Sequence, residues 1–264
     1  MLSNRVRSCL LTAGFKKGFT LLELLASVAI VVVLAALLFP AATRGMESAR
    51  SAKCLGNLRQ LGVAASTYSS ENDGRLVPTY VAGADLASSK VWRGLLLPYL
   101  GDNGKAFICP SDRFEARRTV NSQTLNLGTQ PTSYGINMTY YYGVNGLTLP
   151  VPGFHDYGAE APGRRAASVP HPASTVFICD LGAPDNVSSP VTEWTESNRR
   201  LTQASFGYAS MPNRWRAEDF CIYPRHRGGR ANVLFYDGHV RSVDIAAELV
   251  AHPIGDPQCL YDYH

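Results

Sequence analysis

The hydrophobic pattern of the chain begins with one long apolar run. From Leu24 to Phe39 the only polar residue is Ser27, and apolar residues extend the run to Ala42. A helix needs about 20 apolar residues to cross the hydrocarbon core of a bilayer. The run therefore predicts a transmembrane helix over residues 19–42.

Beyond Pro40 the pattern changes from continuous to periodic. Apolar residues recur there at three- or four-residue steps, and they are Met46, Ala49, Leu55, Leu58, Leu61, Ala65 and Tyr68. This spacing predicts an amphipathic helix over residues 43–71 that continues the apolar one. The run Asn72-Asp73-Gly74 predicts the end of that helix, because these residues favour turns.

Short elements are predicted in the first part of the remaining chain. Residues 91–100 predict a short helix, and residues 106–109, 133–142 and 174–180 predict strands. The centre of the strand at 174–180, residues 176–179, is wholly apolar, which predicts that the strand is buried.

Two stretches of the chain lack a regular pattern. Residues 147–172 are rich in Gly and Pro and predict a long loop or insertion. Residues 182–216 show no periodicity and predict an exposed, variable loop region. We expect both to belong to one head domain over residues 72–264.

Residues 231–243 carry the clearest hairpin signal. Two apolar-rich segments flank Asp237-Gly238, a dipeptide that favours tight hairpin turns. Alternate strand residues point to opposite faces, so at least one face of the hairpin should be buried. With the long helix, these strands predict an α+β fold in which a helical spine packs on a small antiparallel sheet.

The charge distribution separates the first 18 residues from the rest. The whole chain has 25 Lys and Arg against 21 Asp and Glu, and residues 1–18 contribute four basic side chains and no acid, so 21 of each sign remain. Basic residues beside a span stay in the cytoplasm, which predicts that everything after residue 42 lies across the membrane. The balanced remainder shows no basic stripe, so we expect no nucleic-acid partner.

Glu23 lies at the head of the apolar run. A carboxylate inside a membrane costs about 2.5–3.5 kcal/mol on insertion scales, so such a residue indicates a functional site. An ordinary signal peptide has a shorter apolar region followed by a small residue at the cleavage site. Here the run is longer and Gly18 precedes it. On a helix, Phe19 and Glu23 would share one face, because they are four residues apart.

The segment from Lys17 to Glu23 reads KGFTLLE and resembles the leader of type IV prepilins and type II secretion pseudopilins. The resemblance implies that prepilin peptidase cuts between Gly18 and Phe19 and methylates the new N-terminus at Phe19. It also implies that Glu23 serves filament assembly by meeting the N-terminal amine of a neighbouring subunit. The implied partners are other pilin or pseudopilin subunits and the inner-membrane secretion or assembly machinery.

The C-terminal part resembles the prepilin-type processing-associated family, which is defined by a His, nine residues and Asp-Gly. Here ten residues separate His226 from Asp237-Gly238, and Arg230 looks like the extra one, between the preceding Gly-Gly turn and the strand. The resemblance implies that these motif residues support the head. Other fragments that fit the family are residues 54–62, 72–74, 109–112 and 133–135.

Five cysteines remain after residues 1–18 are removed: Cys54, Cys109, Cys179, Cys221 and Cys259. No CxxC pair or Cys/His cluster has the spacing of a zinc site, so no structural zinc is expected. An extracytoplasmic domain can hold disulfides. The family resemblance implies a Cys54–Cys109 pair, and buried free thiols are an equal alternative.

Three acidic or histidine positions invite a catalytic or metal interpretation. Asp237 and His239 flank the turn glycine, and His226 could approach them. An Asp at such a turn more often bonds its own backbone, so we expect a structural role. Asp237, Asp244 and Asp256 do not form the single ligand-rich loop that calcium prefers. With no nucleophile elbow or phosphate-binding loop, we expect no metal, no cofactor and no enzymatic activity.

Two functions from different classes compete. The first is a structural subunit of a type II secretion or type IV pilus-like filament, a single-pass protein of the bacterial inner membrane with a periplasmic or filament-borne head. The second is a membrane-anchored binding protein for a polysaccharide or an exported protein, which uses the leader for delivery. A deep pocket lined by Trp194, Trp215 and tyrosines would favour the binding protein, and a flat head would favour the subunit.

Overall fold

The computed structural model describes the chain over residues 18–81, 90–112, 132–137, 165–169, 171–186, 189–199, 208–209, 221–252 and 256–260. The chain divides into two compact units, Met1–Gly45 and Met46–His264. The second unit is the head, together with the part of the long helix that packs on it.

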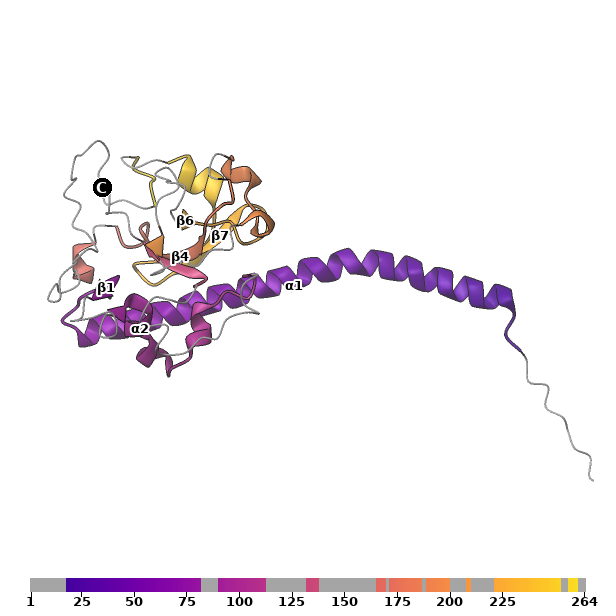
Figure 1. Cartoon of the computed structure of the whole chain (residues 1–264), viewed down its shortest axis with the longest axis horizontal. Coiled ribbons are helices and arrows are strands. Elements are labelled where there is room, and N and C mark those ends of the chain that lie inside the picture. Colours follow the sequence, from indigo (N-terminus) through magenta and orange to yellow (C-terminus); the bar gives the residue numbers. More distant parts are fainter. Residues whose placement is uncertain are drawn as a thin grey trace, which may run out of the picture. The chain divides into compact units, whose positions relative to one another are not determined.

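One helix, α1 (Leu21–Glu71), contains both the apolar run and the periodic segment, as predicted (Figure 1). Its buried residues all lie in its C-terminal half. The helix ends at the predicted turn, where Asp73 and Gly74 have φ angles of 55° and 72°. The Gly74 N–H donates to the Ser69 carbonyl at 2.9 Å, which satisfies a helix-end acceptor.

The described strands of the head form two sheets. The larger has the order β5-β3-β4-β7-β8, with β6 pairing beside it on β4, and the smaller joins β1 to β2. All pairs are antiparallel except β3 with β5. The strands are β1 (Tyr80–Val81), β2 (Lys90–Val91), β3 (Tyr134–Asn137), β4 (Val176–Gly182), β5 (Tyr208–Ala209), β6 (Cys221–Ile222), β7 (Arg230–Phe235) and β8 (Val240–Asp244). The long helix and this mainly antiparallel sheet confirm the predicted α+β, pilin-like arrangement.

Short helices connect these strands. They are α2 (Trp92–Leu96), η1 (Leu97–Leu100), η2 (Gly104–Phe107), η5 (Ala166–Ser168), η6 (Val191–Glu193), η7 (Glu196–Asn198) and η9 (Ile245–Val250). The consecutive helices α2 and η1 confirm the short helix predicted over residues 91–100.

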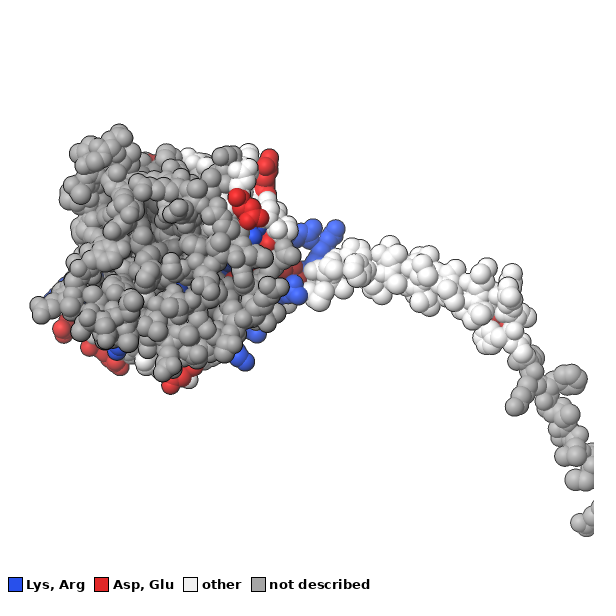
Figure 2. Space-filling view, viewed as in Figure 1, with Lys and Arg blue, Asp and Glu red and all other residues white. Residues whose placement is uncertain are grey.

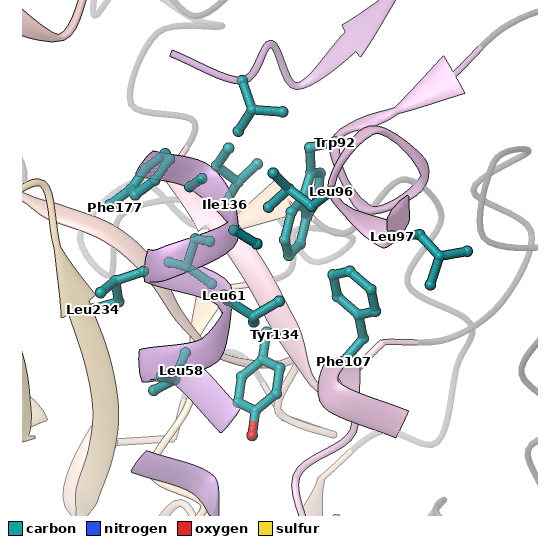
Figure 3. Close-up of a cluster of buried hydrophobic side chains, with 14 of the residues drawn as sticks. Leu58, Leu61, Trp92, Leu96, Leu97, Phe107, Tyr134, Ile136, Phe177 and Leu234 are labelled. Atoms are coloured by element: carbon teal, nitrogen blue, oxygen red, sulfur yellow. The ribbon is translucent and has the colours of Figure 1, made fainter. Parts of the chain in front are cut away.

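One face of the larger sheet packs against α1. Leu58 and Leu61 of the helix are fully buried against side chains from α2, β3, β4 and β7 (Figure 3). The aromatic rings of Trp92 and Phe107 meet edge-on at 5.6 Å within this cluster. Burying each such side chain contributes about 1.5–3 kcal/mol, so this cluster holds the helix on the sheet.

The opposite face of the sheet is buried as well. Ala231, Val233 and Phe235 alternate with Asn232 and Leu234 along β7, and the first three pack with Ile245 and Leu249 of η9. Side chains alternate along a strand, so one strand serves both faces. Side chains alternate along β4 in the same way. Cys179 and Leu181 lie on the face that packs with η9, so Ile178 and Asp180 point to the face that packs against α1.

The strand predicted over residues 106–109 is wrong. Those residues belong mainly to η2 and the turn after it, in which the Ala106 N–H donates to the Asn103 carbonyl and the Ile108 N–H to the Lys105 carbonyl. Phe107 is buried because its ring enters the helix-facing core, not because it lies in a sheet. A short apolar run can be buried in either conformation, so periodicity could not decide between them.

The prediction that residues 182–216 form an exposed loop holds only in part for the described residues of that region, many of which are exposed. Trp194 and Arg199 are only 2% and 5% exposed. Trp194 stacks on Tyr223 with ring centroids 5.5 Å apart, and its indole N–H donates to the Ser189 carbonyl at 3.1 Å. The single turns η6 and η7 contain no buried residue, so the two buried side chains anchor a segment that is otherwise largely exposed.

Some sequence predictions lie outside the described residues. These concern residues 138–142 of the third predicted strand, most of the predicted loop at 147–172, and Trp215. Within the predicted loop, the described residues 165–169 contain η5 and a bridge between Arg75 and Arg165.

The predicted hairpin is present as β7 and β8. Its loop is Tyr236-Asp237-Gly238, closed by the Phe235 N–H donating to the His239 carbonyl at 2.9 Å, and Gly238 has a φ of 91°. Arg230 was predicted to lie between the Gly-Gly turn and the strand, and this is wrong. It is the first residue of β7 and pairs with Asp244. Gly228 and Gly229 have φ angles of 78° and 71°, which turns the chain early enough for pairing to begin at Arg230.

Gly182, at the end of β4, is expected to tolerate no side chain. A Cβ there would lie 2.6 Å from Tyr223 Cγ and 2.8 Å from Arg199 Cδ. Gly182→Ala should therefore lower the free energy of unfolding by about 1–3 kcal/mol through overpacking, measured by urea denaturation. Gly56→Ala is the matched control, because a Cβ at this position in α1 meets no heavy atom within 4 Å. Equal midpoints for the two variants would contradict this expectation.

Candidate functional site

The N-terminal end of α1 is closed by a reciprocal pair of hydrogen bonds between Thr20 and Glu23. The Thr20 N–H donates to Glu23 Oε2 at 2.9 Å, and the Glu23 N–H donates to Thr20 Oγ1 at 3.2 Å. The Thr20 hydroxyl also donates to Glu23 Oε2 at 2.9 Å. This is a capping box, which satisfies two backbone donors that a helix start leaves without partners.

The capping box changes one expectation from the sequence. Because α1 begins at Leu21 with Thr20 as its cap, Phe19 lies before the helix and does not share a helix face with Glu23. Gly18 and Phe19 are both exposed. A Cβ at Gly18 would meet no heavy atom within 4 Å, so the fold of the chain does not require glycine there.

The N-terminal half of α1 exposes an unbroken apolar surface. Fourteen large apolar side chains between Phe19 and Phe39 are each at least 53% exposed. This part of the helix is almost entirely free of charged residues (Figure 2). Leu21–Ala42 at 1.5 Å per residue would span about 33 Å, close to the thickness of a bilayer core. By length and hydropathy, α1 is a candidate membrane span.

The head contains a second group of polar residues, which we call the buried polar cluster. Its members come from α1, the segment after η2, β4, η7 and the segment after β6, and they are Cys54, Cys109, Asp112, Asp180, Glu196, Arg199, Arg225 and His226. Arg225 lies at its centre, with its guanidinium nitrogens 3.4 Å from Asp180, 3.5 Å from Glu196 and 3.6 Å from Asp112. Arg225 also donates to the Ser133 carbonyl at 2.8 Å and to that of Leu181.

Arg199 completes the ionic part of the cluster. Its guanidinium contacts Glu196 through two nitrogens, at 2.9 and 2.7 Å, and Asp112 at 2.7 Å. Asp112 accepts a further hydrogen bond from the Ser133 hydroxyl at 2.7 Å. Buried charges are tolerated only when they are paired in this way, so the cluster fixes how these segments meet.

His226 lies inside the buried polar cluster and not beside Asp237. Its Nε2 is 3.2 Å from Asp180 Oδ2 and 3.7 Å from Cys109 Sγ, and its Nδ1 is 3.3 Å from Glu47 Oε1. Asp237 accepts from the backbone N–H of His239 at 3.0 Å, the local bond expected at such a turn. The two halves of the C-terminal motif therefore act separately, one in the core and one at the hairpin loop.

Among the described residues, one group has side chains suited to hold a metal. Cys54, Cys109, Asp180 and His226 are all buried, and one ligand atom from each lies within 4.8 Å of the others. Both cysteines are free thiols in the structure. The Cys54–Cys109 disulfide implied by the family resemblance stays a prediction.

Comparison with known proteins identifies the N-terminal segment. Residues 15–39 match the family described as the prokaryotic N-terminal methylation motif. The chain is prepilin-like at its N-terminus. Such a motif implies processing by prepilin peptidase and assembly with other pilin subunits, and proteins that carry it are typically structural subunits. No curated protein and no solved structure matches the chain.

In this prepilin-like chain, the buried polar cluster shifts the pKa values of three of its members. Burial would lower the pKa of Arg225, but the carboxylates of Asp112 and Asp180 outweigh it and raise that pKa. Burial would likewise lower the pKa of His226, and Asp180 outweighs it and raises the pKa to about 10. Burial opposes ionisation of Cys109, yet hydrogen bonds with Cys54 and His226 lower its pKa to about 6. The fold thus favours the charged forms of all three groups at neutral pH.

Most of the buried polar cluster was not singled out from the sequence. Asp180 follows the apolar strand residues 176–179, and Arg225 directly precedes the motif His226. A charged residue at such a place is a weak signal, because only the tertiary contacts show that the side chain is buried and paired.

The head also has a groove, and Trp194 is not among the residues that line it. Its volume is about 470 Å³, and it lies between α1 and the hairpin, lined among others by Arg59, Val63, Phe177, Tyr236 and Asp237. Trp194 is part of the core and lines no ligand surface in the described part of the head.

Proposed function

We propose that this prepilin-like chain is a pseudopilin-like structural subunit of a type II secretion or type IV pilus-like filament. The observation that carries the proposal is the methylation motif at residues 15–39, placed at the start of one exposed apolar helix. That helix continues without a break into the core of the head. It can therefore anchor the chain in the membrane and later pack against the helices of other subunits.

The motif residues have separate roles in this proposal. Prepilin peptidase cuts between Gly18 and Phe19 and methylates the amine of Phe19. Glu23 then serves assembly by pairing with the N-terminal amine of a neighbouring subunit. In the uncut chain its carboxylate is held by the Thr20 cap, so it has a partner before assembly begins.

The proposed orientation follows from the charges beside the span. The four basic residues of the leader stay in the cytoplasm, and the head lies in the periplasm or in a surface filament. The partners are prepilin peptidase, other pilin or pseudopilin subunits, and the inner-membrane assembly machinery. In this proposal the chain is the substrate of an enzyme and not itself an enzyme.

The test is the intact mass of the membrane-extracted chain after co-expression with a prepilin peptidase. We expect the natural chain to lose residues 1–18 and to gain one methyl group, whereas Gly18→Ala should keep its full length. Gly14→Ala is the matched control: it removes another leader glycine and should be processed normally. Since Gly18 has no contact that an alanine would disturb, a change in mass would report on cleavage and not on folding.

A full-length mass for the natural chain would overturn the subunit proposal. The leader would then be a plain anchor, and the second candidate, an anchored binding protein, would become the better explanation. The groove between α1 and the hairpin favours that candidate, because its volume is within the range of small-molecule sites.

A further inference from the structure

Four side chains from separate parts of the head converge on one buried point. Cys54 comes from α1, Cys109 from the segment after η2, Asp180 from β4 and His226 from the segment after β6. All four are at most 5% exposed. Because they are far apart in the sequence, only the fold brings them together.

Three separations between these side chains are close to the edges of a tetrahedral metal site. Zinc binds Cys sulfur at about 2.3 Å and His nitrogen or carboxylate oxygen at about 2.0–2.2 Å, which places tetrahedral ligands roughly 3.4–3.8 Å apart. Here Cys54 Sγ lies 3.5 Å from Asp180 Oδ1, and Cys109 Sγ lies 3.7 Å from His226 Nε2. Asp180 Oδ2 and His226 Nε2 are 3.2 Å apart. The two Asp180 contacts involve different oxygens, and one ligand atom from each of the four residues lies within 4.8 Å of the others, so a bound ion would draw the four side chains closer together.

The residues around the group also orient it for a metal. A metal-binding His commonly gives its other ring nitrogen to a carboxylate, and His226 Nδ1 faces Glu47 Oε1 at 3.3 Å. Glu47 Oε1 is itself held by the Ser111 hydroxyl at 2.9 Å. The Asn232 N–H donates to Asp180 Oδ2 at 2.7 Å, which fixes that carboxylate. Nε2 of His226 thereby faces Asp180 Oδ2 and Cys109 Sγ.

The charges of the cluster are compatible with a bound divalent cation. Zinc binds thiolates and a neutral imidazole, so binding releases the thiol protons and the proton on His226 Nε2 to solvent, and the two thiolates balance the charge of Zn²⁺. The nearby Arg225 is already paired with Asp112 and Glu196, so it does not depend on Asp180 alone. The Tyr134 hydroxyl donates to Cys54 Sγ at 3.3 Å, a contact that a thiolate accepts well.

We propose that Cys54, Cys109, Asp180 and His226 bind one Zn²⁺ as a structural site. Two thiolates, an imidazole and a carboxylate suit zinc better than magnesium or calcium, which prefer oxygen ligands alone. Four protein ligands leave no open position for a substrate, so the site stabilises and does not catalyse. Its effect is to tie α1 to β4 and to the two neighbouring segments.

The test uses the full chain, extracted in detergent and purified without chelator. We expect elemental analysis to find about one zinc per chain in the natural protein. The variants Cys109→Ser and His226→Gln should each lose most of it. Cys221→Ser is the matched control, because this buried cysteine lies outside the group and should leave the zinc content unchanged.

Measurements on the natural chain keep the test valid if a variant fails to fold. Replacement by Co²⁺ should produce a sulfur-to-cobalt charge-transfer band, and removal of zinc should lower the melting temperature of the head until zinc, but not magnesium, is restored. The proposal is overturned if the chain holds no zinc and all of its cysteines are free thiols, or if intact mass reveals a Cys54–Cys109 disulfide. It is also overturned if Cys221→Ser loses zinc to the same extent as Cys109→Ser.

Discussion

Arg225→Met should destabilise the head by about 3–5 kcal/mol, the cost usually seen when one partner of a buried ion pair is removed. Asp112 and Asp180 are fully buried around the guanidinium and would be left short of a positive charge. The carbonyls of Ser133 and Leu181 would lose their donor as well. The change is measurable as a shift of the urea midpoint, followed by the fluorescence of the buried tryptophans.

Arg227→Met is the control for this result. Arg227 lies two residues further along the chain, is exposed and belongs to the turn before β7. Its replacement should change stability by no more than about 0.5 kcal/mol, as is usual for surface positions. A loss of less than about 1 kcal/mol in the free energy of unfolding for Arg225→Met would show that the buried polar cluster does not hold the segments of the head together.

Glu23→Ala should abolish incorporation into filaments and leave the head folded. If the proposed pairing with a neighbouring amine is correct, the variant leaves that amine without a partner in an apolar core. Each 1.4 kcal/mol changes an equilibrium constant tenfold, so a cost of about 2.5–3.5 kcal/mol implies a loss of about 60- to 300-fold in assembly. The measurement is the fraction of processed chain recovered in sheared filaments from the native cell.

Two further variants separate the charge of Glu23 from its role in the helix cap. Glu23→Gln keeps an oxygen that can accept from the Thr20 N–H, because Gln also serves in capping boxes, but it removes the charge. Thr20→Val removes the hydroxyl half of the cap and keeps the charge. We expect Gln to fail in assembly like Ala, and Val to assemble. Normal assembly of Glu23→Gln would show that the cap, and not the charge, is what matters.

Local patterns predicted the elements whose signals are strong over a short stretch. The helix over residues 21–71, its end at Asn72–Gly74 and the hairpin around Asp237-Gly238 all follow from periodicity and turn chemistry. Residues 106–109 were mispredicted, because a brief apolar run fits a buried turn as well as a strand. The spacing of cysteines likewise gave no sign of a metal site, since its ligands are separated by tens to more than a hundred residues.

The sequence by itself determined the prepilin-like N-terminus, because its motif, basic leader and apolar run are properties of contiguous residues. It also determined the α+β class, since helix and strand periodicities are local. Only the tertiary structure decided that Arg225, His226 and the two cysteines meet around Asp180, and that Trp194 is core. Burial and pairing of such side chains depend on contacts between distant segments, and these contacts exist only once α1 has packed on the sheet.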